Sequence, residues 1–173
     1  MTDIQKFIRN IPDFPKKGIV FHDITPLLQN AKAFQKSIDM MAEILSDKNI
    51  TSLVGIESRG FIFASALSIK LDTGLVVIRK PGKLPYVTIN ASYDLEYGKD
   101  TLEIHKDAIN KESNVVIVDD LLATGGTAGA AGKLIEQLGG KISGYIFLIE
   151  LTELKGAEKL KPHNVYSVLK FPV

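Results

Sequence analysis

Two adjacent carboxylates, Asp119 and Asp120, stand where the chain passes from an apolar run into a loop of small residues. The run is V-V-I-V at 115–118, and the loop is A-T-G-G-T at 123–127. Carboxylate oxygens accept hydrogen bonds from sugar hydroxyls. Glycines let backbone amides approach an anion, and a helix N-terminus attracts negative charge. This order of residues indicates a site for a phosphorylated sugar.

Arg59 is a second candidate for anion binding. It stands beside Gly60 in a short polar loop that follows the apolar run S-L-V-G-I at 52–56. The planar guanidinium group binds phosphate oxygens through parallel hydrogen bonds, which favours a role as an anion clamp. The alternative is a solvated charge, the ordinary state of a lone arginine in a loop.

A basic loop, R-K-P-G-K-L-P at 79–85, follows the next apolar run. Its cations are Arg79, Lys80 and Lys83. Their density indicates contacts with a polyphosphate, within one chain or across to a neighbouring subunit. The alternative is a solvated surface turn.

The segment 86–105 interrupts the succession of strands and helices. Alternating apolar and polar residues predict two strands with a turn at Gly98-Lys99-Asp100. An isolated hairpin is only marginally stable, so we expect a flexible flap that carries Glu96 and Tyr97 near its tip. The alternative is an exposed hairpin with ordinary polar residues.

The elements that must position these groups alternate between strands and helices. Apolar runs predict strands at 52–56, 75–78, 115–118, 141–151 and 165–169. Helical spacing predicts helices at 31–45, 61–71, 127–138 and 155–160. This order is typical of an α/β domain with a mostly parallel sheet, in which ligands bind beyond the C-terminal strand ends. The polar loops then form one site if the strand order brings them together.

Residues 1–30 precede these elements as an N-terminal arm. A short helix is expected at 3–9 and an irregular segment, with two prolines and a glycine, at 11–18. The stretch I-V-F-H-D at 19–23 carries large apolar groups, so we expect it to lie across another surface. A packed strap is the favoured interpretation, and a lid over a ligand is the alternative.

Composition limits the class of protein. The 173 residues fit one domain, and the net charge of +1 gives no general case for binding nucleic acid or a membrane. The absence of cysteine excludes disulfides and thiolate chemistry. No signal peptide or membrane-spanning run is evident, so a cytoplasmic protein is expected. The chain also lacks the P-loop and dinucleotide-binding glycine patterns, and its three histidines lack metal-ligand spacing.

The stretch V-V-I-V-D-D-L-L-A-T-G-G-T closely resembles the phosphoribosyl-diphosphate (PRPP) signature of the type I phosphoribosyltransferases. Other segments resemble the adenine branch of that family, in order and over essentially the whole chain: 12–28, 57–61, 79–85, 93–98 and 151–156. The resemblance implies the type I phosphoribosyltransferase fold, an α/β structure with a mostly parallel central sheet flanked by helices. It also implies an N-terminal hood (1–30) and a flexible hairpin flap (86–105) on one domain.

The resemblance implies a reaction as well. Members of this branch are pentosyltransferases (EC 2.4.2.7) of purine salvage, which join adenine to the 5-phosphoribosyl group of PRPP and give AMP and diphosphate. Mg²⁺ is expected as the cofactor, bound mainly through PRPP and not by protein side chains. A homodimer is expected too, because the arm and the basic loop expose more apolar and cationic surface than a monomer needs.

The resemblance assigns ligand-binding roles to residues of this chain. The 5′-phosphate of PRPP and AMP would be bound by Ala123, Thr124, Gly125, Gly126 and Thr127. The diphosphate would be bound by Arg59, Arg79, Lys80, Lys83 and Tyr97. Adenine would be bound by Val20, Phe21, His22 and Leu121, with the rings of the base between Phe21 and Leu121 and its edge at backbone groups of the other two.

The resemblance also assigns catalytic roles. Asp119 and Asp120 would bind the ribose hydroxyls and favour an oxocarbenium-like sugar centre, Arg59 would hold the leaving diphosphate, and Glu96 would handle the proton of the purine ring. Family members can carry Arg where this chain has His22, a change that is benign if the backbone makes the contact there.

Two alternative functions stay open at this level. The same fold could accept hypoxanthine, guanine, xanthine or orotate, although a 6-oxopurine site usually needs a donor such as lysine near O6, whereas the arm offers backbone groups and His22. A PRPP- or nucleotide-sensing regulator is the other alternative. Such regulators usually carry a nucleic-acid-binding surface, and this chain has no helix-turn-helix extension or basic excess.

Overall fold

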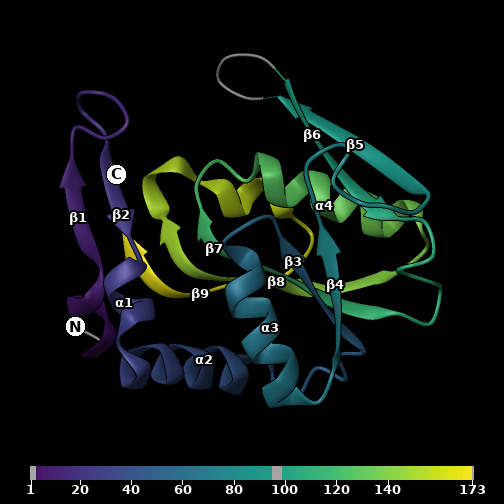
Figure 1. The fold of residues 1–173 in the computed structure, drawn as a ribbon, viewed down its shortest axis with the longest axis horizontal. Helices are drawn as coiled ribbons and strands as arrows, with labels where there is room; N and C mark the ends of the chain where they lie inside the picture. The colour runs from purple at the N-terminus through teal and green to yellow at the C-terminus, as the bar shows by residue number, and fades with distance from the viewer. Residues whose placement is uncertain (1–2, 95–98, 173) are drawn as a thin grey trace.

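A five-stranded parallel sheet forms the centre of the protein, whose computed structural model describes residues 3–94 and 99–172. The strand order is β4-β3-β7-β8-β9, and every neighbouring pair is parallel (Figure 1). The strands are β4 (Gly74–Ile78), β3 (Ser52–Ile56), β7 (Asn114–Leu122), β8 (Lys141–Leu151) and β9 (Val165–Phe171). The expected α/β class with a mostly parallel sheet is confirmed.

Strand β7 lies in the middle of this sheet and separates two apolar cores. Val116 and Val118 point into one core, whereas Val115 and Ile117 point into the other, and all four are fully buried. Burial on both faces explains the unbroken run of β-branched residues. The strand was expected to end at residue 118, but it continues to Leu122, because the ladder with β8 extends through the acidic pair. Both carboxylates therefore belong to the strand.

Helices and the hairpin cover the two faces of the sheet (Figure 1). Helices α2 (Ala31–Leu45) and α3 (Gly60–Leu71) contribute to the first core, together with the short α1 (Thr25–Gln29). Helix α4 (Gly126–Gln137) and the hairpin contribute to the second. The sheet is thus enclosed between two apolar layers, which leaves the ends of its strands as the polar edges.

The N-terminal arm forms a small antiparallel sheet of its own. A 3₁₀ helix, η1 (Asp3–Phe7), leads into β1 (Arg9–Pro12), which pairs with β2 (Val20–Asp23). Arg9 closes the pair at one end, with its Nη2 atom 2.7 Å from Oδ2 of Asp23. The irregular segment predicted at 11–18 is shorter in the structure, because Ile11 and Pro12 lie in β1. Only the connection between the two strands is irregular.

The hairpin consists of β5 (Thr88–Asp94) and β6 (Lys99–His105). The predicted turn at 98–100 is wrong for Lys99 and Asp100, which lie in β6 opposite Asp94 and Tyr93. One face of the hairpin is apolar and buried against the second core. Its base is joined to the end of β4 by two backbone hydrogen bonds between Arg79 and Glu103, of 2.9 and 2.8 Å.

The chain after β8 makes two short 3₁₀ helices before the last strand. They are η2 (Thr152–Leu154) and η3 (Gly156–Leu160), so the helix predicted at 155–160 is present as a 3₁₀ turn. Within the described part of the chain, no helix has the length and apolar character needed to cross a membrane.

Candidate active site

Three polar loops meet at the C-terminal ends of the strands, which we call the C-terminal edge of the sheet. Because β3, β4 and β7 are parallel neighbours, the segments that follow them leave from the same side. These segments are residues 57–60, the basic loop 79–85 and the loop 123–127, which we call the phosphate loop. The strand order therefore brings together groups that are more than 60 residues apart in the chain.

Arg59 and Asp120 form the central contact of this edge. Arg59 immediately precedes α3, and its Nε atom lies 2.9 Å from Oδ2 of Asp120. The carboxylate is buried, with 4% of the residue exposed. The contact lacks hydrogen-bond geometry, and Oδ2 accepts no hydrogen bond from the residues that the structure describes. A buried acceptor in this state is suited to a ligand hydroxyl.

Gly60 makes that contact possible. A Cβ atom at this position would lie 2.7 Å from the carbonyl oxygen of Val118 and 3.0 Å from Oδ1 of Asp119. Only glycine lets the first turn of α3 approach the backbone of β7 this closely. The close approach is what carries the guanidinium group of Arg59 to Asp120.

Burial raises the pKa of both adjacent carboxyls. The pKa of Asp119 lies well above its ordinary value because the group is buried and because the charge of Asp120 is close by. Burial also raises the pKa of Asp120, against the opposing effect of the Arg59 guanidinium. Two carboxyls that resist full ionisation in the absence of a ligand are typical of a functional site.

The phosphate loop lines a cavity of about 190 Å³ at the N-terminus of α4. All five predicted residues of the loop contribute to its wall, together with Asp119 and Leu121. Helix α4 begins at Gly126, so the positive end of its dipole faces the cavity. The loop backbone and the helix N-terminus at this cavity are features that suit a phosphate group.

Two glycines shape the phosphate loop. Gly125 has a φ of +79°, and a Cβ atom there would lie 2.5 Å from the carbonyl oxygen of Gly156. A Cβ atom on Gly156 would in turn collide with the carbonyl oxygen of Ala123. The chain at η3 thus supports the loop from behind. The sequence analysis gives Gly156 no role, although this glycine ends the segment 151–156 that resembles the adenine branch.

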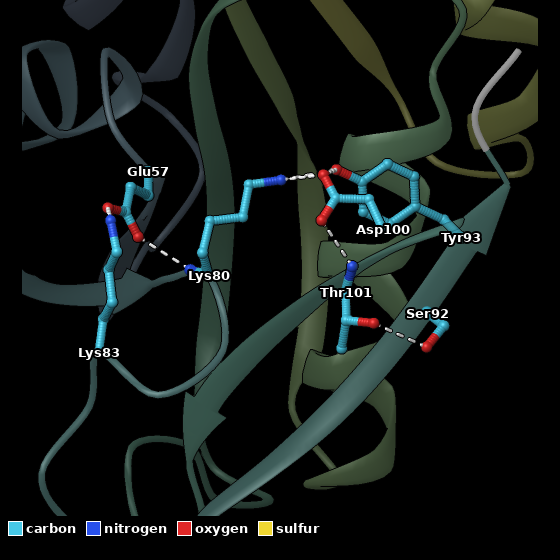
Figure 2. A network of polar contacts seen from close by, with 7 residues as sticks. All are labelled: Glu57, Lys80, Lys83, Ser92, Tyr93, Asp100 and Thr101. Carbon is cyan, nitrogen blue, oxygen red and sulfur yellow. Dashed lines mark hydrogen bonds and ion pairs between the residues drawn. The ribbon is translucent and has the colours of Figure 1, made fainter. Parts of the chain in front are cut away.

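Glu57 organises the basic loop, and the sequence assigned it no role. Its carboxylate accepts hydrogen bonds from Lys83 Nζ (2.9 Å) and from the backbone N–H of Lys80 (2.8 Å) (Figure 2). It also accepts one from Arg79 Nη2 (3.2 Å). Burial by itself raises the pKa of Glu57, but the bonds from Lys83, Lys80 and Arg79 outweigh it and hold the pKa at about 2. The available signal is a single acid directly after the apolar run 52–56 and two residues before Arg59.

The three cations of the basic loop do not converge. Arg79 and Lys83 both bond to Glu57. The Lys80 side chain instead extends to the hairpin, where it pairs with Asp100 and donates to the Tyr93 hydroxyl (Figure 2). The Nε–H of Arg79 is buried and has no hydrogen-bond partner among the described residues. This N–H group is an available donor for an anion.

The arm reaches the same edge through Phe21. Its ring lies under the Arg59 guanidinium, with 5.5 Å between the Cζ atom and the ring centroid. Leu121 stands one residue beyond Asp120 on β7, half-buried beside the phosphate loop. Val20 is 40% exposed on the arm. The structure thus puts an aromatic ring and an aliphatic side chain near the carboxylate pair.

The side chain of His22 is used in packing. It is 6% exposed, its Nδ1 atom lies 2.8 Å from Oδ1 of Asn10, and its ring lies 4.5 Å from that of Phe171. Burial lowers its pKa. With the imidazole enclosed between the arm and β9, a contact from this residue to a base would come from its backbone.

Glu96 and Tyr97 lie outside the described residues, so their roles stay predictions. Within 3–94 and 99–172, no group of three or more His, Cys, Asp or Glu side chains is arranged to hold a metal ion.

The fold and the site together define an α/β protein with an anion clamp, a buried carboxylate pair and a glycine-rich loop beyond the C-terminal ends of a parallel sheet. The model of the phosphoribosyl transferase domain family matches residues 23–172, and the chain belongs to that family.

Similar proteins extend this result over the whole chain. An adenine phosphoribosyltransferase from Pseudothermotoga lettingae is 53% identical over 169 residues, which cover 98% of this chain and 99% of that protein. The crystal structure of the adenine phosphoribosyltransferase from Thermoanaerobacter pseudethanolicus matches with a TM-score of 0.95 and 53% identity, over 98% of both chains. The Saccharomyces cerevisiae enzyme, in a complex with an imino-altritol bisphosphate and adenine, matches with a TM-score of 0.91 and 44% identity, over 96% of this chain and 97% of that one.

Proposed function

We propose that the protein is an adenine phosphoribosyltransferase of purine salvage, which converts adenine and PRPP to AMP and diphosphate. The observation that carries the proposal is the Arg59–Asp120 contact beside the phosphate loop. It joins an anion clamp, an acceptor for hydroxyls and a phosphate cradle within one site. The adenine phosphoribosyltransferases described above, similar over nearly their full length, support the choice of reaction.

The ends of PRPP would be held by different loops. The phosphate loop would bind the 5′-phosphate through its amides and the N-terminus of α4. Arg59 and the basic loop would bind the diphosphate, for which the buried Nε–H of Arg79 is one available donor. Asp119 and Asp120 lie between these loops and would accept hydrogen bonds from the ribose hydroxyls.

Catalysis would depend on charge at the anomeric carbon and on the leaving group. As the bond to diphosphate lengthens, the ribose centre becomes electron-poor, and the carboxylates of Asp119 and Asp120 stabilise it. The charge that leaves with the diphosphate is stabilised by the guanidinium of Arg59 and the cations of the basic loop. Glu96 would handle the proton of the purine ring, and Tyr97 would contact the diphosphate.

Adenine would bind between the arm and β7. Phe21 and Leu121 supply apolar surfaces for the two faces of the ring. Because the His22 imidazole is enclosed by Asn10 and Phe171, the edge of the base would meet backbone groups of Val20 and His22. The yeast relative, whose structure contains adenine, supports this choice of base.

Mg²⁺ would bind mainly through the oxygens of PRPP, as the resemblance to the family implies. When bound, it neutralises part of the negative charge on the departing diphosphate.

The buried Oδ2 atom of Asp120 has no hydrogen-bond partner among the described residues, and a ribose hydroxyl would supply one.

We also propose that the chain is one phosphoribosyltransferase domain that works as a cytoplasmic homodimer. Helix α3 is apolar on nearly every side and buries Phe63 and Leu67, yet it leaves Ile62 38% and Ile69 85% exposed. A helix that is apolar all round is normally covered on all sides. A second copy of the chain would cover this face, and sedimentation of the active protein as a monomer would contradict the assignment.

The experiment that tests the reaction is direct. Purified protein is incubated with adenine and PRPP, with and without Mg²⁺, and AMP and diphosphate are measured together. Equal amounts of both products, formed only with Mg²⁺, are expected. Diphosphate release without AMP would indicate hydrolysis of PRPP, and the absence of both products would refute the proposal.

A further inference from the structure

Lys80 has a partner that the proposed reaction does not use. Its ammonium group pairs with Oδ2 of Asp100 on β6 and lies 3.2 Å from the hydroxyl of Tyr93 on β5 (Figure 2). The Tyr93 hydroxyl also donates a hydrogen bond of 2.9 Å to the same oxygen of Asp100. The three side chains therefore form a closed triangle between the basic loop and the hairpin.

This triangle is separate from the backbone attachment of the hairpin. The base of the hairpin is held by the paired backbone bonds between Arg79 and Glu103, and by the Gly82 N–H, which donates to Oε2 of Glu103 at 3.1 Å. Asp100 lies three residues further along β6 toward the tip. Loss of its ion pair would thus leave the hairpin attached to β4.

The triangle is partly open to solvent. The side chain of Lys80 is 37% exposed and that of Asp100 is 28% exposed, so a dissolved anion can reach the ammonium. Burial alone lowers the pKa of Lys80, but the bonds to Asp100 and Tyr93 outweigh it and raise the pKa. The bond from Lys80 is the main cause that lowers the pKa of Asp100. Both groups are therefore charged at neutral pH.

A carboxylate at this place competes with the ligand that the basic loop is proposed to bind. Arg79 and Lys83 share the charge of Glu57, and Lys80 is committed to Asp100. A diphosphate with several negative charges offers Lys80 a stronger counter-ion, but Lys80 must leave Asp100 to pair with it. Asp100 also repels the incoming anion. Each effect lowers the affinity for diphosphate.

We propose that Asp100 is an internal competitor for Lys80, which pairs with this lysine in the absence of ligand and yields it to the diphosphate group of PRPP or of the product. Tyr93 supports the competing state by its hydrogen bonds to both partners. Asp100 is thus a positioning residue, which acts on the ligand through Lys80. The inference depends on the proposed function, because it takes Lys80 as a ligand of diphosphate.

The variant Asp100→Asn tests this inference, because the proposal requires tighter binding. A partly exposed ion pair is typically worth about 0.2–1 kcal/mol, so the Kd for magnesium diphosphate, measured by calorimetry, should fall by about 1.5- to 5-fold. The KM for PRPP should fall in parallel, and the KM for adenine should not change. Tyr93→Phe should shift the Kd in the same direction by a smaller factor.

Two comparisons make the result specific. Asp47→Asn also removes one negative charge, but in the turn between α2 and β3, at the N-terminal end of the strands. This control should leave the Kd unchanged. Lys80→Met should by itself raise the Kd for magnesium diphosphate. In that background, Asp100→Asn should lower the Kd by a clearly smaller factor than it does in the parent. That difference identifies Lys80 as the route of the effect.

Several results would overturn the inference. An Asp100→Asn protein with unchanged or weaker diphosphate binding would refute competition, and equal tightening with and without Lys80 would reduce it to general repulsion. If the parent makes AMP from adenine and PRPP while either result is found, only this inference fails. If the parent makes no AMP and binds no diphosphate, the proposed function fails first.

Discussion

Replacement of Glu57 by glutamine tests how the basic loop is held. Glu57→Gln keeps the shape of the side chain and one oxygen that can accept the Lys80 N–H. It removes the negative charge that Arg79 and Lys83 share. With the charge gone, both cations lose their anchor, and we expect a lower stability.

The size of the stability effect follows from the pKa of Glu57. The difference between the ordinary value of 4.5 and the value of about 2 in the folded protein corresponds to at most about 3 kcal/mol at pH 7. Because the Lys83 side chain is half exposed, solvent screening reduces this, and about 1–2 kcal/mol is expected. For a chain of this length, that loss lowers Tm by about 2–8 °C.

The pH dependence gives the prediction its sign. The folded pKa of Glu57 is depressed, so its contribution is fully present above about pH 4.5 and is lost as the pH falls toward 2. The difference in unfolding free energy between parent and Glu57→Gln should therefore shrink by roughly half between pH 7 and pH 3. Urea unfolding at both pH values measures it, with Glu43→Gln on the exposed side of α2 as the control. A difference that is the same at both pH values would refute the reasoning.

Three further substitutions test the geometry of the site. Asp120→Asn should lower kcat by at least about 10²-fold without loss of stability, because burial already disfavours the charged carboxyl; a near-normal kcat would remove Asp120 from the mechanism. Gly60→Ala should cost about 1–3 kcal/mol in urea unfolding and raise the KM for PRPP, since its Cβ meets the Val118 carbonyl; an unchanged KM would show that the close approach is dispensable. Gly125→Ala should cost at least about 1–2 kcal/mol, because of its positive φ and the Gly156 carbonyl, and should weaken AMP binding; normal AMP affinity in calorimetry would count against the phosphate loop.

Local pattern was enough to predict most of the fold. Helix α2 and strands β3 and β8 lie where the sequence predicts them, since their apolar periodicity agrees with their burial. The end of β7 was misplaced, because the acidic pair looks like the start of a loop while its ladder with β8 continues. The hairpin turn was misplaced for a related reason, because polar residues such as Asp100 also occur at the exposed end of a strand.

The residues that the sequence missed act through contacts between distant segments. Glu57 and Lys83 are 26 positions apart, and Lys80 and Asp100 are 20 apart, so no local periodicity connects them. The sequence predicts that Lys80 acts together with Arg79 and Lys83 as one cationic cluster. In the structure, Lys80 instead pairs with Asp100 on the hairpin (Figure 2). The choice of base depended on resemblance, since no single spacing in the arm specifies adenine.

The most direct test of the account is a comparison of kcat/KM for adenine, hypoxanthine and guanine, with saturating PRPP and Mg²⁺. A site that binds the edge of adenine through matched backbone donors and acceptors should reject 6-oxopurines, so we expect a preference for adenine of at least about 10³-fold. The product from adenine should be AMP, in equal amount to diphosphate. Comparable turnover of hypoxanthine, or none of adenine, would contradict the account.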